Sequence, residues 1–241
     1  MNHSSEVVEL DWTGHGISVA HRATRGLREP SPPIEQREIL YEDLDAGIVV
    51  GSSLFCPAST QMKSEWKDEL LTVQQGRATI ELADGGTISV QAGDTAFISA
   101  GTAHRWIYHE SFAKEFLWLL ESESGVPTAI KIDPELELSP SRSPGNDVLL
   151  TDTPECKSKI LYQRTDGRLT LMLWSSTPYR RRSASHAKHE LMRFISGAAR
   201  LRQAHGRTFS CGPGYGVFVP VGADVAWEND TDVLKIACFV S

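Results

Sequence analysis

The chain has few cysteines, no long apolar run and no excess of basic residues, and each of these absences excludes a class of protein. Its 241 residues include only four cysteines, which lie far apart and form no CxxC pair. A disulfide framework is therefore not expected, and we predict reduced thiols in a cytoplasmic protein. No charged and then apolar signal segment opens the chain, and no stretch approaches the ~20 apolar residues of a membrane helix. The formal net charge of −7 comes without a basic stripe, which argues against nucleic acid as a partner.

One pattern is present twice, which indicates two copies of one folded unit. A constant offset of 121 positions relates Glu69, Gly76, Gly93, Gly101 and Trp106 to Glu190, Gly197, Gly214, Gly222 and Trp227. Glycines that recur in register mark backbone positions that other residues tolerate poorly, so the copies share a fold. Differences between the copies should then report on function.

Short apolar runs separated by turns fill most of the chain, with little helical periodicity. This pattern predicts an all-β protein of sandwich or barrel type. Prolines break the polar N-terminal stretch, and a segment rich in Pro, Ser, Glu and Asp separates the two copies. We expect an N-terminal arm at 1–45 lying over the first unit, the first unit at 46–120, a linker at 121–158 and the second unit at 159–241.

Glu69 stands on an expected strand together with Leu71 and Val73, so strand alternation should turn its carboxylate toward the core. An unpaired buried carboxylate costs several kcal/mol, so a positive group must compensate it. The sequence therefore predicts a cation or a metal beside Glu69.

The spacing of Glu69, Gly76, Gly93-Asp94, Gly101 and His104 resembles the two characteristic cupin motifs. More specifically, the runs from Glu69 to Gly76 and from Ser176 to Arg182 resemble the ureidoglycine-aminohydrolase-like cupin family. The resemblance covers both copies and implies a bicupin, which is two tandem β-barrels of jelly-roll type.

In that family a metal is usually held by an HxH pair, a Glu and a later His. The matching positions of the first copy are Lys63, Glu65, Glu69 and His104. Those of the second copy are Ala184, His186, Glu190 and Val225. The resemblance thus implies either no cofactor or a single divalent transition metal on Glu65, Glu69 and His104, with His186 and Glu190 as a weaker second set.

Two alternatives remain open for the first copy. A metal could be bound there, or the ammonium of Lys63 could fill its place and pair with the carboxylates. In either case Lys63, Glu65, Glu69 and His104 are the candidate catalytic residues, since a carboxylate beside a histidine can move protons near neutral pH.

Other residues could contact a substrate. Trp106 and Trp227 could stack on a ligand or fill the barrels, and Arg180, within an Arg-Arg-Arg run, could clamp an anion or lie on a solvated edge. His189 should face away from Glu190 and be exposed.

These residues support two functions. One is an enzyme of hydrolase, lyase or isomerase type that acts on a small polar metabolite in the first barrel. The other is a non-catalytic small-molecule-binding or sensor protein with degenerate metal sites. Monomer and homodimer are both compatible with a bicupin.

Overall fold

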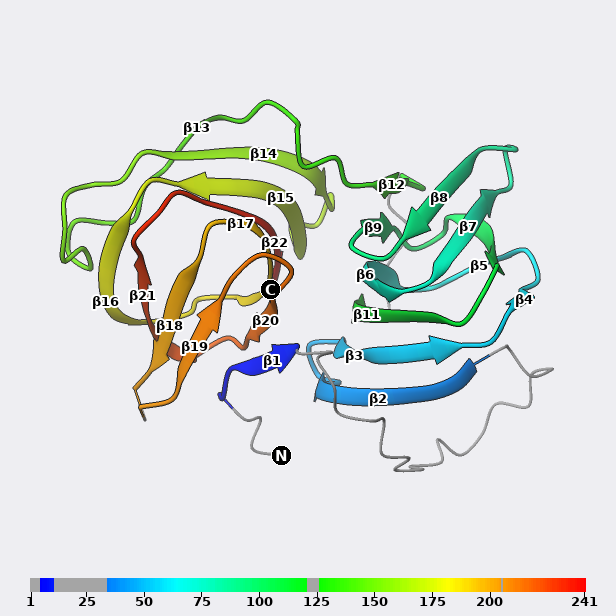
Figure 1. The fold of residues 1–241 in the computed structure, drawn as a ribbon, viewed down its shortest axis with the longest axis horizontal. Coiled ribbons are helices and arrows are strands. Elements are labelled where there is room, and N and C mark those ends of the chain that lie inside the picture. Colours follow the sequence, from blue (N-terminus) through cyan, green and yellow to red (C-terminus); the bar gives the residue numbers. More distant parts are fainter. Residues whose placement is uncertain (1–4, 11–33, 121–125, 205) are drawn as a thin grey trace. The chain divides into compact units, whose positions relative to one another are not determined.

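A computed structural model describes residues 5–10, 34–120, 126–204 and 206–241. Within these ranges every regular element is a β-strand, so none of them forms a helix that could cross a bilayer. The all-β prediction is confirmed. The chain divides into two compact units, Trp12–Ile132 and Met1–Asp11 with Asp133–Ser241 (Figure 1).

The first unit is a barrel of two antiparallel sheets. One sheet has the order β12-β9-β6-β11-β3-β2 and the other β4-β10-β7-β8, with β5 also paired to β10. Their bounds are β2 (Ile34–Asp43), β3 (Ile48–Phe55), β4 (Ala58–Ser59), β5 (Lys63–Ser64), β6 (Asp68–Gln75), β7 (Arg77–Leu82), β8 (Thr87–Gln91), β9 (Thr95–Ile98), β10 (Ala103–Tyr108), β11 (Phe112–Leu119) and β12 (Ala129–Lys131).

The second unit repeats this plan, and its strands curl around one interior (Figure 1). Its sheets have the orders β1-β20-β17-β22-β15-β14-β13 and β16-β21-β18-β19. Their bounds are β1 (Val8–Leu10), β13 (Ser139–Ser141), β14 (Cys156–Gln163), β15 (Leu169–Ser176), β16 (Tyr179–Ser185), β17 (His189–Ser196), β18 (Ala199–Gln203), β19 (Thr208–Cys211), β20 (Gly216–Val219), β21 (Asp224–Asn229) and β22 (Val233–Val240).

The strand boundaries repeat with the same offset of 121 positions as the sequence motifs. The bounds of β3, β6, β9, β10 and β11 each recur 121 positions later in β15, β17, β20, β21 and β22. Equivalent positions therefore point into equivalent places of the two barrels.

Apolar side chains from both sheets fill each barrel. The first core includes Leu71, Val73, Ile80 and Trp106. The second contains residues equivalent to several of these, among them Met192, Phe194 and Trp227. All four cysteines lie in the described ranges, and none forms a disulfide.

The N-terminal arm differs from the sequence-based expectation. Val8–Leu10 pairs with β20 and so extends the sheet of the second unit, whereas 34–43 pairs with β3 in the first barrel. The backbone groups of β20 need partners, and the apolar Val7 and Leu10 are buried there. The expected linker at 121–158 contains β12 and β13 and the start of β14. Residues 11–33 and 121–125 of the arm and linker lie outside the described residues.

The repeated glycines give a first prediction. Gly197 has φ +71, and an added Cβ would lie 1.9 Å from the carbonyl oxygen of Asp232. Gly197→Ala should therefore lower the free energy of unfolding by about 3 kcal/mol, from a left-handed backbone and a clash with rigid backbone. Gly214→Ala, at φ +81 but in open space, should cost only about 1 kcal/mol. Urea unfolding followed by circular dichroism would measure both, and equal losses would contradict the clash.

Candidate functional site

A buried ion pair lies in the interior of the first barrel. Glu69 on β6 and Lys114 on β11 share the faces of their strands with the core residues Leu71 and Phe112. Lys114 Nζ lies 2.7 Å from Glu69 Oε1, and the two side chains are only 5% and 8% exposed. Trp118 Nε1 donates a second hydrogen bond to the same oxygen at 3.0 Å. The carboxylate is thus fully compensated.

The second barrel contains the same pair. Lys235 Nζ on β22 lies 2.7 Å from Glu190 Oε1 on β17. It also lies 2.9 Å from Met192 Sδ and 4.9 and 5.0 Å from the ring centres of Trp174 and Trp227. Both lysines and both glutamates are 121 positions apart, so the ion pair belongs to the duplicated unit.

Burial and the neighbouring charges shift the pKa values of these four side chains in opposite directions. Burial favours the neutral form of Glu69, but the ammonium groups of Lys114 and then Lys67 outweigh it and lower the pKa of Glu69 to about 2. Burial lowers the pKa of Lys114, against the attraction of Glu69. The pKa of Glu190 is also lowered, because Lys235 outweighs the effect of burial. Both carboxylates are therefore ionised near neutral pH.

Lys63 forms one of the two ion pairs predicted from sequence. Lys63 pairs with Glu65, as expected, with Nζ 2.8 Å from Oε1, but its side chain is 51% exposed on the short edge strand β5. Lys67 Nζ reaches the other Glu65 oxygen at 3.1 Å. These cations hold the pKa of Glu65 low despite its partial burial. The expected pairing of Lys63 with Glu69 was wrong, since Lys114 fills that place.

The sequence contained a signal for the correct lysines. Lys114 and Lys235 recur at the same offset as the glycines, and each stands within a largely apolar strand. A lysine on the interior face of a barrel strand needs an anionic partner. The offset of 121 positions, applied to lysines as well as to glycines, therefore identifies Lys114 and Lys235 as candidate partners of Glu69 and Glu190.

His104 lies on β10 and is 4% exposed. Its Nδ1 lies 2.8 Å from the carbonyl oxygen of Thr102, so this nitrogen carries the proton. Burial lowers the pKa of His104, although the acceptor of Thr102 and the charge of Glu69 oppose the effect. The imidazole is neutral near pH 7. Its catalytic role, like those of Lys63, Glu65 and Glu69, stays a prediction.

The interior residues do not fit a divalent transition metal. Such a metal takes three or four His, Cys or carboxylate ligands in proteins. Among the residues that the structure describes, no three of these side chains converge closely enough to hold one. An ammonium group also lies 2.7 Å from Glu69 and from Glu190, where it would repel a second cation. The two suggested ligand sets, of Glu65, Glu69 and His104 and of His186 and Glu190, are therefore not assembled as metal sites.

Both repeated tryptophans pack in the cores. Trp106 and Trp227 are 6% and 4% exposed. Lys114 Nζ lies 4.6 Å from the ring centre of Trp106, and Trp227 stacks on Tyr179 at 5.9 Å. The prediction that they fill the barrels is confirmed, and stacking on a ligand stays a prediction.

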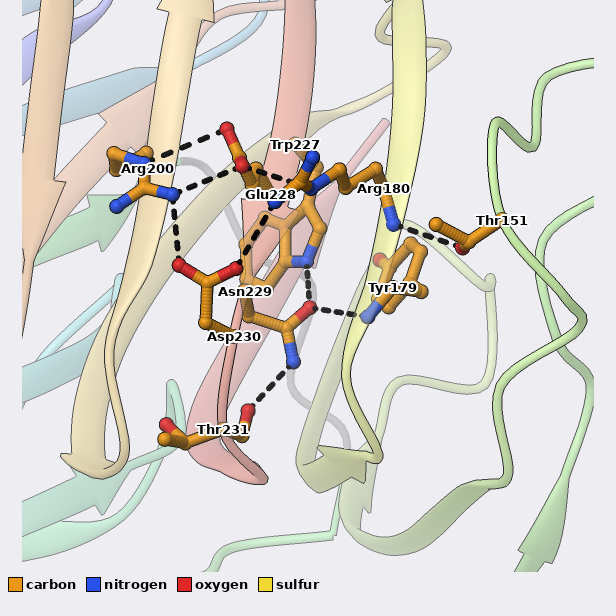
Figure 2. Close-up of polar contacts among 9 residues, drawn as sticks. All are labelled: Thr151, Tyr179, Arg180, Arg200, Trp227, Glu228, Asn229, Asp230 and Thr231. Carbon is orange, nitrogen blue, oxygen red and sulfur yellow. Dashed lines mark hydrogen bonds and ion pairs between the residues drawn. The ribbon is translucent and has the colours of Figure 1, made fainter.

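Arg180 points away from the barrel interior. Its Nε lies 2.8 Å from Glu228 Oε1 and its Nη2 lies 3.3 Å from Asp230 Oδ1. Arg200 binds both acidic residues at 2.9 and 2.8 Å, so four charges form one network on the outer face of the sheet (Figure 2). Arg180 is half exposed and already paired. Of its two neighbours in the run, Arg181 is the one that points inward.

Beside this network, one amide orients the wall of the barrel. Asn229 Oδ1 accepts hydrogen bonds from Trp227 Nε1 at 2.7 Å and from the backbone of Tyr179 at 3.3 Å (Figure 2). Its Nδ2 donates to the carbonyl oxygens of Thr177 and Thr231. All hydrogen-bonding groups of this buried amide are used, so both aromatic residues are held in place.

The second barrel contains a cavity of about 390 Å³. Aromatic and apolar residues make up most of its wall. The lining residues are Pro144, Gly145, Val148, Trp174, Tyr179, Arg181, Ser185, His186, Ala187, Glu190, Met192, Leu201, Trp227, Lys235 and Phe239.

A chain of polar contacts leads from the cavity to the ion pair. Arg181 Nη2 lies 3.4 Å from His186 Nε2, and His186 Nδ1 lies 3.6 Å from Glu190 Oε2. A guanidinium only donates, so Nε2 is the acceptor and Nδ1 carries the proton. Burial lowers the pKa of His186, against the attraction of Glu190, so its imidazole is neutral.

His189 is buried, contrary to the sequence-based expectation. It does face away from the barrel interior, but the outer face of β17 is covered as well. Its ring stacks on Phe218 of β20 at 5.8 Å, and its Nδ1 accepts the backbone N–H of Val221 at 3.3 Å. Strand alternation predicted its direction but not what covers that face.

The ion pair of the first barrel predicts a non-additive mutational cycle. Lys114→Met or Glu69→Gln alone should each lower the free energy of unfolding by about 3–5 kcal/mol, because each leaves a buried group without its partner. The double variant should recover most of that loss. Urea unfolding of the four proteins would test this. Additive losses would mean that the pair is not coupled.

The same pair predicts a loss of stability in acid. The pKa of Glu69 is about 2 in the folded chain against 4.5 for an ordinary Glu, so its contribution is complete above about pH 4.5 and disappears toward pH 2. The loss should be about 3 kcal/mol across that range. Between pH 7 and pH 3, where part of that loss has occurred, the Glu69→Gln/Lys114→Met double variant should lose about 2 kcal/mol less than the unmodified protein in urea unfolding. The same slope in both proteins would contradict the assignment.

Comparison with known proteins agrees with this fold. Residues 50–116 match the family described as the EutQ-like cupin domain. A protein of unknown function from Pseudomonas syringae pv. tomato is 26% identical, with a TM-score of 0.79 and coverage of 84% of this chain and 85% of that one. Among curated proteins none matches the chain significantly.

Two more distant structures share the fold. A cupin 2 conserved barrel domain protein from Leptotrichia buccalis is 10% identical, with a TM-score of 0.62 and coverage of 89% and 92%. Protein Ylba from E. coli is 15% identical, with a TM-score of 0.55 and coverage of 90% and 88%. With two jelly-roll barrels in a strict repeat and a match to a cupin domain at residues 50–116, the chain has the cupin fold.

Proposed function

We propose that this protein binds a small polar metabolite in the interior of its second barrel and does so without a metal. The cavity beside Arg181, His186 and Tyr179 is the observation that carries the proposal. Its volume lies at the lower end of the range of roughly 300–1,000 Å³ for ligand pockets, which suits a small molecule. Lys235 supplies the positive charge that a metal would otherwise bring to Glu190.

The proposed ligand site lies in the second barrel, whereas the sequence favoured the first. In the first barrel the interior carboxylate is neutralised by Lys114, and the aromatic rings of Phe55, Trp106, Tyr108 and Phe112 pack on one another. The second barrel retains interior polar groups that border a cavity. A binding or sensor role follows directly from this geometry.

An enzyme in the first barrel is the second candidate. Its support is His104, which is buried and neutral and whose Nδ1 proton is held by Thr102. Its Nε2 is then a proton acceptor near Glu69, as hydrolase, lyase or isomerase chemistry would need. The catalytic assignment of Lys63 and Glu65 belongs to this candidate.

The resemblance to ureidoglycine-aminohydrolase-like bicupins supports the fold but not that reaction. The activity implied by the family name resembles a metal-dependent one. In this chain lysines stand beside the glutamates where the metal would be. We therefore propose that this protein is a bicupin of this kind that binds a different ligand. Reduced thiols and the acidic charge favour a cytoplasmic protein with no nucleic-acid or membrane partner, as a monomer or homodimer.

Two substitutions at equivalent positions would test the site. Ser185 is an exposed residue of the cavity wall, and Ser64 is its exposed equivalent 121 positions earlier. Ser185→Trp should abolish the binding of small organic fragments seen by ligand-observed NMR, because the indole fills the cavity. Ser64→Trp should leave it unchanged.

Metal analysis of the untagged protein should give far less than one divalent ion per chain, with no decrease in Glu190→Gln. Binding that survives Ser185→Trp but is lost in Ser64→Trp would place the site in the first barrel. Stoichiometric metal that is lost in Glu190→Gln would contradict the role of Lys235.

A further inference from the structure

We propose that the ligand of the second barrel is a small monocarboxylate with an apolar or aromatic body, bound through Arg181. The inference rests on the proposed function, since it names the class of molecule that the cavity takes. It follows from the charges that line the cavity once the internal pairings are accounted for.

Three charged side chains line the cavity, namely Arg181, Glu190 and Lys235. Glu190 and Lys235 neutralise each other at 2.7 Å. Among the residues that the structure describes, no carboxylate forms an ion pair with Arg181. The cavity therefore carries one net positive charge, which a single negative charge on a ligand would balance.

His186 orients the arginine without neutralising it. Its Nε2 accepts from Arg181 Nη2 at 3.4 Å, while its Nδ1 faces Glu190. Since the imidazole is neutral, it adds a dipole but no charge. The contact is long for a hydrogen bond, so Arg181 can exchange it for a stronger, charge-assisted bond to a ligand.

Arg180, the neighbour of Arg181 on β16, has a charge that acidic side chains balance. It pairs with Glu228 and Asp230 on the outer face, where Arg200 joins the network (Figure 2). The two arginines are adjacent on β16, and strand alternation sends them to opposite faces. Only the inward one lacks an acidic partner.

A carboxylate fits this site better than a phosphate group. The planar guanidinium offers two parallel donors that match the two oxygens of a carboxylate. A dianionic phosphate would leave one negative charge uncompensated beside the buried ion pair, which is unfavourable.

Tyr179 adds a further donor, because burial raises the pKa of its hydroxyl and keeps it protonated. Within the described part of the chain that hydroxyl has no hydrogen-bonding partner. The remaining wall defines the body of the ligand. Trp174, Trp227 and Phe239 contribute aromatic surface, and Val148 and Leu201 contribute aliphatic surface. A short polyanion would leave these surfaces without contacts, whereas an aromatic or branched aliphatic acid would cover them.

The test compares three probes that share a phenyl ring, namely benzoate, benzamide and phenyl phosphate, by titration calorimetry on the full chain. Benzoate should bind at least tenfold more tightly than either of the others. Arg181→Gln should remove that preference, and Arg181→Lys should retain part of it. Arg180→Gln is the matched control, which should leave the affinity for benzoate unchanged. Ser185→Trp should abolish binding of all three probes.

Each outcome distinguishes the inference from the proposal beneath it. If benzamide binds as tightly as benzoate and Ser185→Trp abolishes both, the cavity is a ligand site but the carboxylate assignment is wrong. A preference for phenyl phosphate, or a loss of benzoate binding in Arg180→Gln equal to that in Arg181→Gln, would also overturn the inference. If none of the probes binds and no fragment is sensitive to Ser185→Trp, both proposals fail.

Discussion

The structure of each barrel depends on an ion pair between a glutamate and a lysine in a low-dielectric interior. Neither Glu69 nor Glu190 could be buried without a cation, and neither Lys114 nor Lys235 could be buried without an anion. The two partners lie on adjacent strands of one sheet, so the pair favours the strand register that brings them together. The pair thereby constrains the register of two strands and leaves no net charge from its two members in the interior.

That neutrality decides what the interior can do. A carboxylate already paired with an internal ammonium does not attract a metal, so the lysine takes over the electrostatic role of a metal in the cupin barrel. The cation is then permanent, since no dissociation removes it from the chain. Function must come from the groups that surround the pair, and these differ between the copies.

The surrounding groups diverge at equivalent positions. Glu65 of the first barrel, paired with two lysines, corresponds to His186 of the second, which is neutral and contacts Arg181. Arg181 itself corresponds to Thr60, whose hydroxyl accepts a hydrogen bond from the backbone N–H of Trp106 and carries no charge. The duplication thus conserved the frame of the barrel and its ion pair, while a few interior positions made one copy a cavity with a net charge.

The sequence by itself determined the all-β fold, the duplication and the inward direction of Glu69, because turn residues, strand alternation and a constant offset can all be read along the chain without knowing which strands pair. It also contained Lys114 and Lys235 at that offset, but nothing local states which cation reaches which carboxylate. Only the tertiary structure decided that Lys63 stays at the surface, that His189 is covered, and that Arg181 rather than Arg180 faces a cavity. Pairing, burial and cavities depend on which strands become neighbours, and those strands can lie far apart in sequence, as where Val8 of β1 pairs with Phe218 of β20.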